Sequence, residues 1–195
     1  MWLGYLTGSY KYYEDALTLD TGYCNPFRLE TIPVLERASE LFPESWKPHY
    51  YLGNLLYEKQ PDNALAEWKK VIEIAPENAM AWRNIGWYWW LYAKDYKESA
   101  KYYLKAIELD PPSALYLDAA NHVLEAAGES VQFRHDLLKS HHETAVKRYY
   151  PLAGEVITGM FTGDFDYILD LLANCYFPTR EGVANFHDIY MDALL

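Results

Sequence analysis

Three prolines recur at nearly equal spacing, and each ends a segment with the pattern of an amphipathic helix. Pro43, Pro76 and Pro111 lie 33 and 35 residues apart. The segments that they close share an apolar face of helical period and are Leu35–Phe42, Trp68–Ala75 and Tyr103–Asp110. A helical segment that repeats with a period near 34 and ends at proline is typical of stacked helix pairs. The sequence therefore predicts an all-α repeat protein of antiparallel helix pairs.

Two repeats are clearest. In the first, Tyr50–Tyr57 and Ala64–Ile74 are expected to be helices, and Pro61–Asn63 is expected to be the turn between them. The second begins at Ala81–Gly86, turns at Lys94–Tyr96 and continues as a helix to Leu109. Small residues such as Gly53 and Ala64 would let neighbouring helices approach, and large apolar residues such as Trp68 would fill the gaps.

These units resemble the tetratricopeptide repeat. The positions that carry the resemblance are Trp82, Ile85, Gly86, Tyr96, Ala106 and Pro111 in one unit and Leu52, Gly53, Ala64, Val71 and Pro76 in the other. The resemblance implies a right-handed superhelical solenoid over residues 1–195, with the best repeats at about 46–78 and 79–113. More degenerate pairs are expected at about 1–42, 114–141 and 143–176. Because the array starts and ends within a repeat, we expect a fragment of a longer protein.

The less regular parts still carry helix and turn signals. Ser113–Ala127 and Ser130–Ser140 are expected to form one pair, and the segment from Glu143 to Asn174 another, with its turn at Gly163–Asp166. Near the N-terminus, Thr7–Tyr10 reads as a turn before a helix that runs to about Leu19. The sequence also predicts a loop at Thr21–Arg28, a helix at Leu29–Phe42 and a further helix within Gly182–Leu195.

Several phrases are similar to a particular group of large bacterial proteins. They are Asn25–Glu30, Ile32, Val34–Glu36, Pro48–Tyr57 and Phe177–Gly182. Members of that group carry an N-terminal, mostly β domain of unknown function before a tetratricopeptide array, and tend to be encoded beside carbohydrate-active enzymes. The resemblance implies an accessory role in carbohydrate processing as an alternative function. The 195 residues do not include that β domain, so no chemistry of the domain is transferred to them.

Composition narrows the classes of partner. Hydrophobic residues make up 51% of the 195 residues, which favours a packed core over disorder. The net charge of -11 disfavours binding to nucleic acid or to an anionic membrane surface. No apolar run approaches the roughly 20 residues that cross a bilayer, and the N-terminus lacks the basic start of a signal peptide. Two isolated cysteines, Cys24 and Cys175, fit structural thiols in a reducing cytoplasm.

No motif in the chain points to catalysis. There is no Gly-x-Ser-x-Gly sequence and no glycine-rich phosphate loop. The histidines are scattered, and the adjacent His141 and His142 would diverge by about 100° on a helix, so they cannot jointly face one metal ion. Asp164 and Asp166 are better explained as residues of a turn and a first helical turn. We therefore expect no enzymatic activity, no cofactor and no metal site.

An aromatic-rich concave surface is the best candidate for function. By resemblance, the first helix of each repeat lines this surface, and its exposed residues are Tyr50, Asn54, Tyr57, Glu58, Arg83, Trp87, Trp90, Leu91, Asp118, His122 and Glu125. Aromatic residues and arginine dominate protein interfaces, so the surface suits a peptide, a helix or a neighbouring domain. Two alternatives remain open: the aromatic residues pack against missing parts of the same protein, or they stack on sugar rings.

Overall fold

The computed structural model describes residues 1–20 and 25–177, and all of the regular elements in these ranges are helices. The chain divides into two compact units, residues 1–94 and 95–195. The predicted helix within Gly182–Leu195 lies outside the described residues, as do Cys24 and most of the phrase Phe177–Gly182. The predicted all-α class is confirmed.

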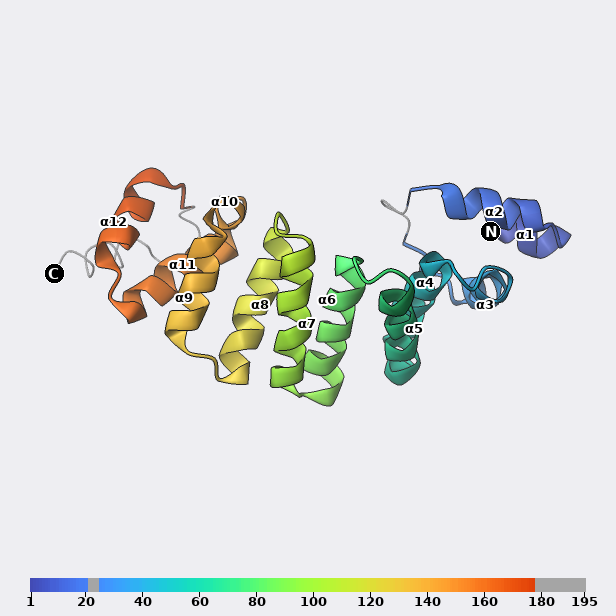
Figure 1. The fold of residues 1–195 in the computed structure, drawn as a ribbon, viewed down its shortest axis with the longest axis horizontal. Helices are drawn as coiled ribbons and strands as arrows, with labels where there is room; N and C mark the ends of the chain where they lie inside the picture. The colour runs from blue at the N-terminus through green and yellow to red at the C-terminus, as the bar shows by residue number, and fades with distance from the viewer. Residues whose placement is uncertain (21–24, 178–195) are drawn as a thin grey trace. The chain divides into compact units, whose positions relative to one another are not determined.

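The first unit is a row of helices in which each packs on its neighbour. Its elements are α1 (Trp2–Thr7), α2 (Tyr10–Thr18), the 3₁₀ turn η1 (Leu29–Thr31), α3 (Ile32–Leu41), α4 (Trp46–Leu56), α5 (Pro61–Ile74), α6 (Ala79–Tyr88) and the π-helical turn η2 (Trp89–Ala93). Helix α3 packs on α4, α4 on α5 and α5 on α6 (Figure 1). Packing between successive helices is typical of a helical repeat array.

The second unit repeats this arrangement. Its elements are α7 (Tyr96–Leu109), α8 (Ala114–Ala127), α9 (Val131–Ser140), the short α10 (His142–Ala145), α11 (Tyr149–Thr162) and α12 (Phe165–Asn174). Helix α7 packs on α8, α8 on α9, α9 on α11 and α11 on α12. The pair predicted between Glu143 and Asn174 is present as α11 and α12. Pro151 lies in the first turn of α11, where proline is tolerated.

The three periodic prolines do end helices. Helices α3, α5 and α7 stop one residue before Phe42, Ala75 and Asp110, and each of these residues directly precedes a proline. Their φ angles are -133°, -133° and -136°. A residue before proline is excluded from the helical region by the proline ring, so the backbone turns outward at that point.

Capping side chains set several helix starts. The Asn78 side chain accepts a hydrogen bond from the Ala81 amide at 3.1 Å, and the Asp95 side chain accepts one from the Glu98 amide at 3.0 Å. The turn expected at Pro61–Asn63 was wrong, because these residues form the start of α5 and Pro61 is its first residue. Proline suits this position because its fixed φ is helical and the first amide of a helix needs no intrahelical partner.

Close helix packing explains the small residues of the first clear repeat. A Cβ atom added to Gly53 would lie 2.3 Å from Nε1 of the buried Trp68 indole. Ala64 on α5 is fully buried, so a larger side chain there would also push the helices apart. The expectation that Gly53 allows α5 to cross close to α4 is therefore confirmed.

The aromatic segment after Gly86 departs from simple helical expectation. Helix α6 ends at Tyr88, and the next five residues form η2, which ends where Lys94 adopts a left-handed φ of 54°. The Trp89 indole N–H is buried and has no hydrogen-bond partner among the described residues. A π-helical turn shifts the side-chain register, so the periodicity of α6 does not continue through Trp89–Ala93.

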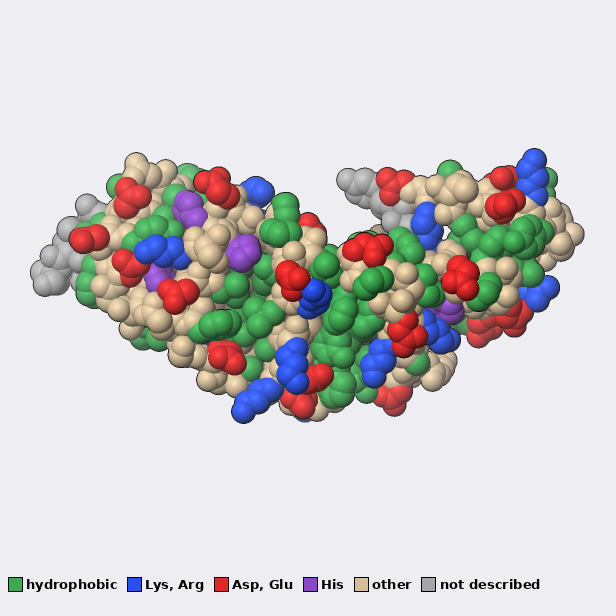
Figure 2. Space-filling model, in the orientation of Figure 1, with side chains coloured by type: hydrophobic (Ala, Val, Ile, Leu, Met, Phe, Trp, Pro, Cys, Tyr) green, Lys and Arg blue, Asp and Glu red, His purple; other side chains and the backbone are tan. Residues whose placement is uncertain are grey.

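The surface carries mixed charge. On the face seen in Figure 2, acidic side chains are spread over both units, with basic side chains among them. None of the helices in residues 1–20 and 25–177 is both long and apolar enough to cross a membrane.

Candidate functional site

A groove in the first unit is lined by several of the residues singled out from the sequence. It is a cavity of about 360 Å³ between α4, α5 and α6, and we call it the first groove. Its lining residues are Asn25, Tyr50, Asn54, Tyr57, Trp68, Arg83, Asn84 and Trp87. Five of the eleven residues predicted for the concave surface, Tyr50, Asn54, Tyr57, Arg83 and Trp87, thus line one cavity.

Two asparagine amides in the first groove are held by hydrogen bonds. Oδ1 of Asn54 accepts from Nε1 of Trp68 at 3.1 Å and from Nδ2 of Asn84 at 3.0 Å. Both bonds use the oxygen of Asn54, so its amide nitrogen retains two N–H donors without a partner among the described residues. Asn84 likewise keeps its carbonyl oxygen as an acceptor. The groove therefore presents a fixed donor beside a fixed acceptor.

Arg83 is the positive charge of the first groove. No hydrogen bond or ion pair joins its guanidinium to another side chain in the described parts of the chain, although the chain is strongly acidic. Its charge acts on the nearby Tyr57. Burial and the Glu58 carboxylate raise the pKa of the Tyr57 hydroxyl, and Arg83 partly opposes this shift. An unpaired arginine can bind a carboxylate through two parallel hydrogen bonds.

Aromatic side chains form the rest of the first groove. The Tyr57 ring packs on Trp68 with centroids 6.3 Å apart, and the Tyr50 ring packs on Tyr51 at 5.6 Å. Trp87 on α6 is 37% exposed. The Tyr92 hydroxyl donates to the Tyr57 carbonyl at 2.8 Å and so ties η2 to the end of α4.

The remaining predicted residues are placed elsewhere. Glu58 does not line the cavity, but its carboxylate accepts from the Tyr57 hydroxyl at 3.4 Å. Trp90 lies in η2 and is also outside the cavity lining. Asp118 and His122 lie on α8 of the second unit, one helical turn apart, with 3.6 Å between Oδ1 and Nε2. The sequence prediction omitted Trp68 and Asn84 as groove residues, although an asparagine on the buried side of a helix is itself a sign of a polar contact.

The second unit contains a comparable groove between α8, α9 and α11, which we call the second groove. Its cavity of about 190 Å³ is lined by Asn121, His122, Glu125, Arg134, Tyr150, Ala153, Gly154, Ile157, Thr158 and Phe161. Oδ1 of Asn121 accepts from Nη1 of Arg134 at 3.5 Å, and Nη2 of Arg134 pairs with Glu125 at 3.2 Å. The arginine of this groove is thus already paired.

A buried polar cluster lies beside the second groove. The side chain of Glu155 is fully buried on α11, and it accepts hydrogen bonds from the Tyr167 hydroxyl and from Nδ1 of His142 at 3.1 Å. Burial and the hydrogen bond to Glu155 raise the pKa of the Tyr167 hydroxyl well above its usual range. Close by, His135 bridges Thr158 and Asp164, and Lys139 and His135 together hold the pKa of Asp164 below its usual range.

Comparison with known proteins agrees with this fold. A family model described as tetratricopeptide repeat matches residues 91–113. The structure of YrrB, a tetratricopeptide repeat protein with an unusual peptide-binding site, is similar with a TM-score of 0.60, 20% identity and 73% of each chain covered. MamA is similar with a TM-score of 0.58, 13% identity and 84% of each chain covered. PilF of Pseudomonas aeruginosa is similar with a TM-score of 0.56 and 18% identity over 74% of this chain and 67% of its own. The chain has the fold of a helical tetratricopeptide solenoid.

Proposed function

We propose that this protein is a non-enzymatic interaction scaffold whose first groove binds an extended peptide segment of a partner protein. The observation that carries the proposal is the amide pair of Asn54 and Asn84. A peptide backbone offers one carbonyl acceptor and one N–H donor per residue. The free donors of Asn54 and the free acceptor of Asn84 complement that pair of groups, and internal hydrogen bonds already fix their positions.

The charge of Arg83 favours an acidic side chain in the bound segment. Because Arg83 has no ion pair in the described structure, a ligand carboxylate would not have to displace one. Tyr50, Tyr57 and Trp87 would supply apolar contact area around this ion pair. The peptide-binding site described for YrrB supports the same class of function, although the low sequence identity means that the likeness concerns the fold.

Selection from a library of random peptides tests the proposal without a known partner. The peptides that bind the wild-type chain are measured against Arg83→Gln, Asn84→Ala and Trp87→Ala by fluorescence anisotropy. We expect each variant to bind at least about tenfold more weakly, the size of one lost charge-assisted or buried contact. Tyr176→Ala, which changes an exposed aromatic residue of the second unit, is the matched control. Selected peptides that bind all four variants equally would contradict the proposal.

Sugar recognition is the second candidate, because Trp87 exposes an aromatic face beside two amide side chains. It would fit an accessory role in carbohydrate processing. Titration of oligosaccharides against tryptophan fluorescence distinguishes the two functions. A saturable response that Trp87→Ala abolishes would favour glycan binding, and no response to any oligosaccharide would count against it.

A further inference from the structure

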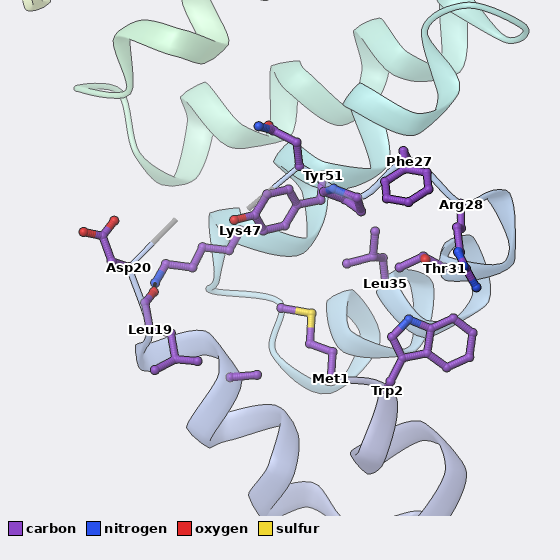
Figure 3. Close-up of a pocket in the computed structure, with 13 residues that line it drawn as sticks. Met1, Trp2, Leu19, Asp20, Phe27, Arg28, Thr31, Leu35, Lys47 and Tyr51 are labelled. Carbon is purple, nitrogen blue, oxygen red and sulfur yellow. Dashed lines mark hydrogen bonds between the residues drawn. The ribbon is translucent and has the colours of Figure 1, made fainter. Parts of the chain in front are cut away.

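A second cavity in the first unit has a different character from the first groove. It has a volume of about 610 Å³ and lies between α1, the end of α2, α3, α4 and the segment that precedes η1. We call it the N-terminal pocket. Most of its lining surface is apolar. Figure 3 shows Leu35 and Tyr51 at its inner side, with Met1 beneath them.

The aromatic walls of the N-terminal pocket are exposed, unlike its floor. Leu35 and Tyr51 are buried core residues, whereas Trp2 is 43% and Phe27 is 82% exposed. Large aromatic side chains that stand open around a concave apolar floor leave apolar area in contact with water. A ligand that enters the pocket would remove that area from water. The cavity volume falls within the roughly 300–1,000 Å³ typical of small-molecule sites.

Two basic side chains, Arg28 and Lys47, line the N-terminal pocket together with one carboxylate, Asp20. Arg28 stands at one end beside Trp2 and Phe27, and Lys47 stands at the other end with Leu19 and Asp20 (Figure 3). The Arg28 guanidinium lies 5.9 Å from the Phe27 ring centroid and has no ion pair within residues 1–20 and 25–177. Nζ of Lys47 is committed to the carbonyls of Leu17 and Leu19, at 2.6 and 2.5 Å. Arg28 is therefore the cation available to a ligand.

We propose that the N-terminal pocket binds a small amphipathic anion, with its apolar body between Trp2, Phe27 and Leu35 and its anionic head group at Arg28. A carboxylate or sulfonate on an alkyl or aromatic body has this chemistry. In a chain of net charge -11 the general field repels anions, so Arg28 and Lys47 together give this cavity a local advantage over the rest of the surface. A cationic amphiphile would meet the same two positive charges and bind less well.

The inference does not depend on peptide binding. Asn25 lines both cavities, so the experiment changes only residues that line the N-terminal pocket and not the first groove. Anilinonaphthalene sulfonate, itself an aromatic anion, serves as the fluorescent probe. Decanoate, decanol and decylammonium, all below their micelle concentrations, serve as competitors that share one alkyl chain and differ in head-group charge.

We expect decanoate to displace the probe. Decanol should bind about tenfold more weakly, because it cannot form a charge-assisted hydrogen bond with Arg28. Decylammonium should bind more weakly than decanol. Arg28→Gln should weaken decanoate about tenfold and leave decanol unchanged, whereas Trp2→Ala should weaken both. Arg37→Gln is the matched control, because Arg37 is paired with Glu40 on α3 and does not line the pocket. The inference is overturned if the probe does not bind, if decylammonium competes as well as decanoate, or if Arg28→Gln behaves like Arg37→Gln.

Discussion

The first and second grooves are each lined by three helices, but the side chains of the third helix differ between them. In each, an asparagine on the first helix accepts a hydrogen bond from a side chain of the second, Asn54 from Trp68 and Asn121 from Arg134. The third helix then makes the difference. In the first groove it supplies Arg83, Asn84 and Trp87, whereas in the second groove α11 supplies Tyr150 and Phe161, which are 60% and 76% exposed.

This difference indicates how a repeat scaffold acquires a binding function. The first groove leaves an arginine and two amides without all of their possible partners, so they are open to a ligand. In the second groove Glu125 already pairs with Arg134, and α11 adds the exposed rings of Tyr150 and Phe161. The same helical frame therefore gives one groove suited to polar backbone recognition and another whose arginine is already paired.

The largest expected effect concerns the cores of the two units. Tyr167→Phe removes the hydroxyl that donates to the fully buried Glu155. We expect it to lower the free energy of unfolding by about 3 kcal/mol, because the buried carboxylate then loses one of its two donors and keeps only His142. Tyr13→Phe in the first unit is the control. The buried Tyr13 hydroxyl has no hydrogen-bond partner in the described chain, so its removal should be neutral or stabilising. Urea unfolding measures both, and equal effects would contradict the assigned role of Tyr167.

The next effect compares a glycine on α4, which carries part of the first groove, with a glycine on α11 that lines the second groove. Gly53→Ala would place a Cβ 2.3 Å from the rigid, buried Trp68, and we expect a loss of about 2 kcal/mol after the gain in helix propensity. Gly154→Ala would approach only the terminal Nδ2 of Asn121, at 2.9 Å, which can rotate away. We expect it to lower the free energy of unfolding by less than about 0.5 kcal/mol, because the higher helix propensity of alanine offsets most of the steric cost. Thermal unfolding of the two variants tests this prediction. A larger destabilisation by Gly154→Ala than by Gly53→Ala would contradict the packing described for the two glycines.

The third prediction separates the two arginines by function. Arg83→Gln should weaken the binding of an acidic peptide selected on the wild-type chain by about tenfold, because it removes the cation that lines the first groove without an ion pair to the described residues. Arg134→Gln should leave that affinity within about twofold, since the Arg134 guanidinium is engaged by Asn121 and Glu125 in the other groove. Isothermal titration of the same peptide against both variants makes the comparison. Similar losses in both would remove the distinction between the grooves.

The smallest expected effect is the dependence of folding stability on pH. Each unit has a carboxylate bound by a histidine and a lysine: Glu67 by His49 and Lys70, and Asp164 by His135 and Lys139. Burial alone would raise the pKa of Glu67, but the hydrogen bonds from His49 and Lys70 outweigh it and lower that pKa. The pKa of Asp164 is lowered mainly by Lys139 and then by His135.

A lowered carboxylate pKa stabilises the folded state above the unfolded pKa near 4, and the contribution is lost as pH falls below it. Glu67→Gln should therefore destabilise at pH 7 by under about 1 kcal/mol and have less effect at pH 3. Asp164→Asn should also destabilise more at pH 7 than at pH 3, but by a smaller amount, because the Asp164 side chain is more exposed than that of Glu67. Urea midpoints at both pH values check this, and a larger effect at pH 3 would contradict the sign.

Much of the fold could be predicted from the sequence because local chemistry specifies it. The prolines after Phe42, Ala75 and Asp110 stop helices by a steric rule that needs no tertiary information. Pro61 was misplaced because proline is favoured both in turns and at the first position of a helix. The π-helical turn at Trp89–Ala93 was missed because no residue type marks such a turn.

The candidate groove could be predicted only in part. The resemblance to the tetratricopeptide repeat put Tyr50, Asn54 and Tyr57 on one surface, and the three residues line one cavity. Asn84 was missed because its importance comes from a contact with Asn54, 30 residues earlier. Likewise, the cluster around Glu155 depends on contacts between α10, α11 and α12, which no local pattern reveals.

A double-mutant cycle in the first groove tests the central proposal most directly. An acidic peptide selected on the wild-type chain and its carboxamide analogue are each titrated against wild type and Arg83→Gln. If the peptide carboxylate pairs with Arg83 beside the Asn54–Asn84 amides, the two changes should couple by about 1 kcal/mol or more. Additive losses, with no coupling for any carboxylate of the peptide, would contradict the proposal that the first groove is the binding site.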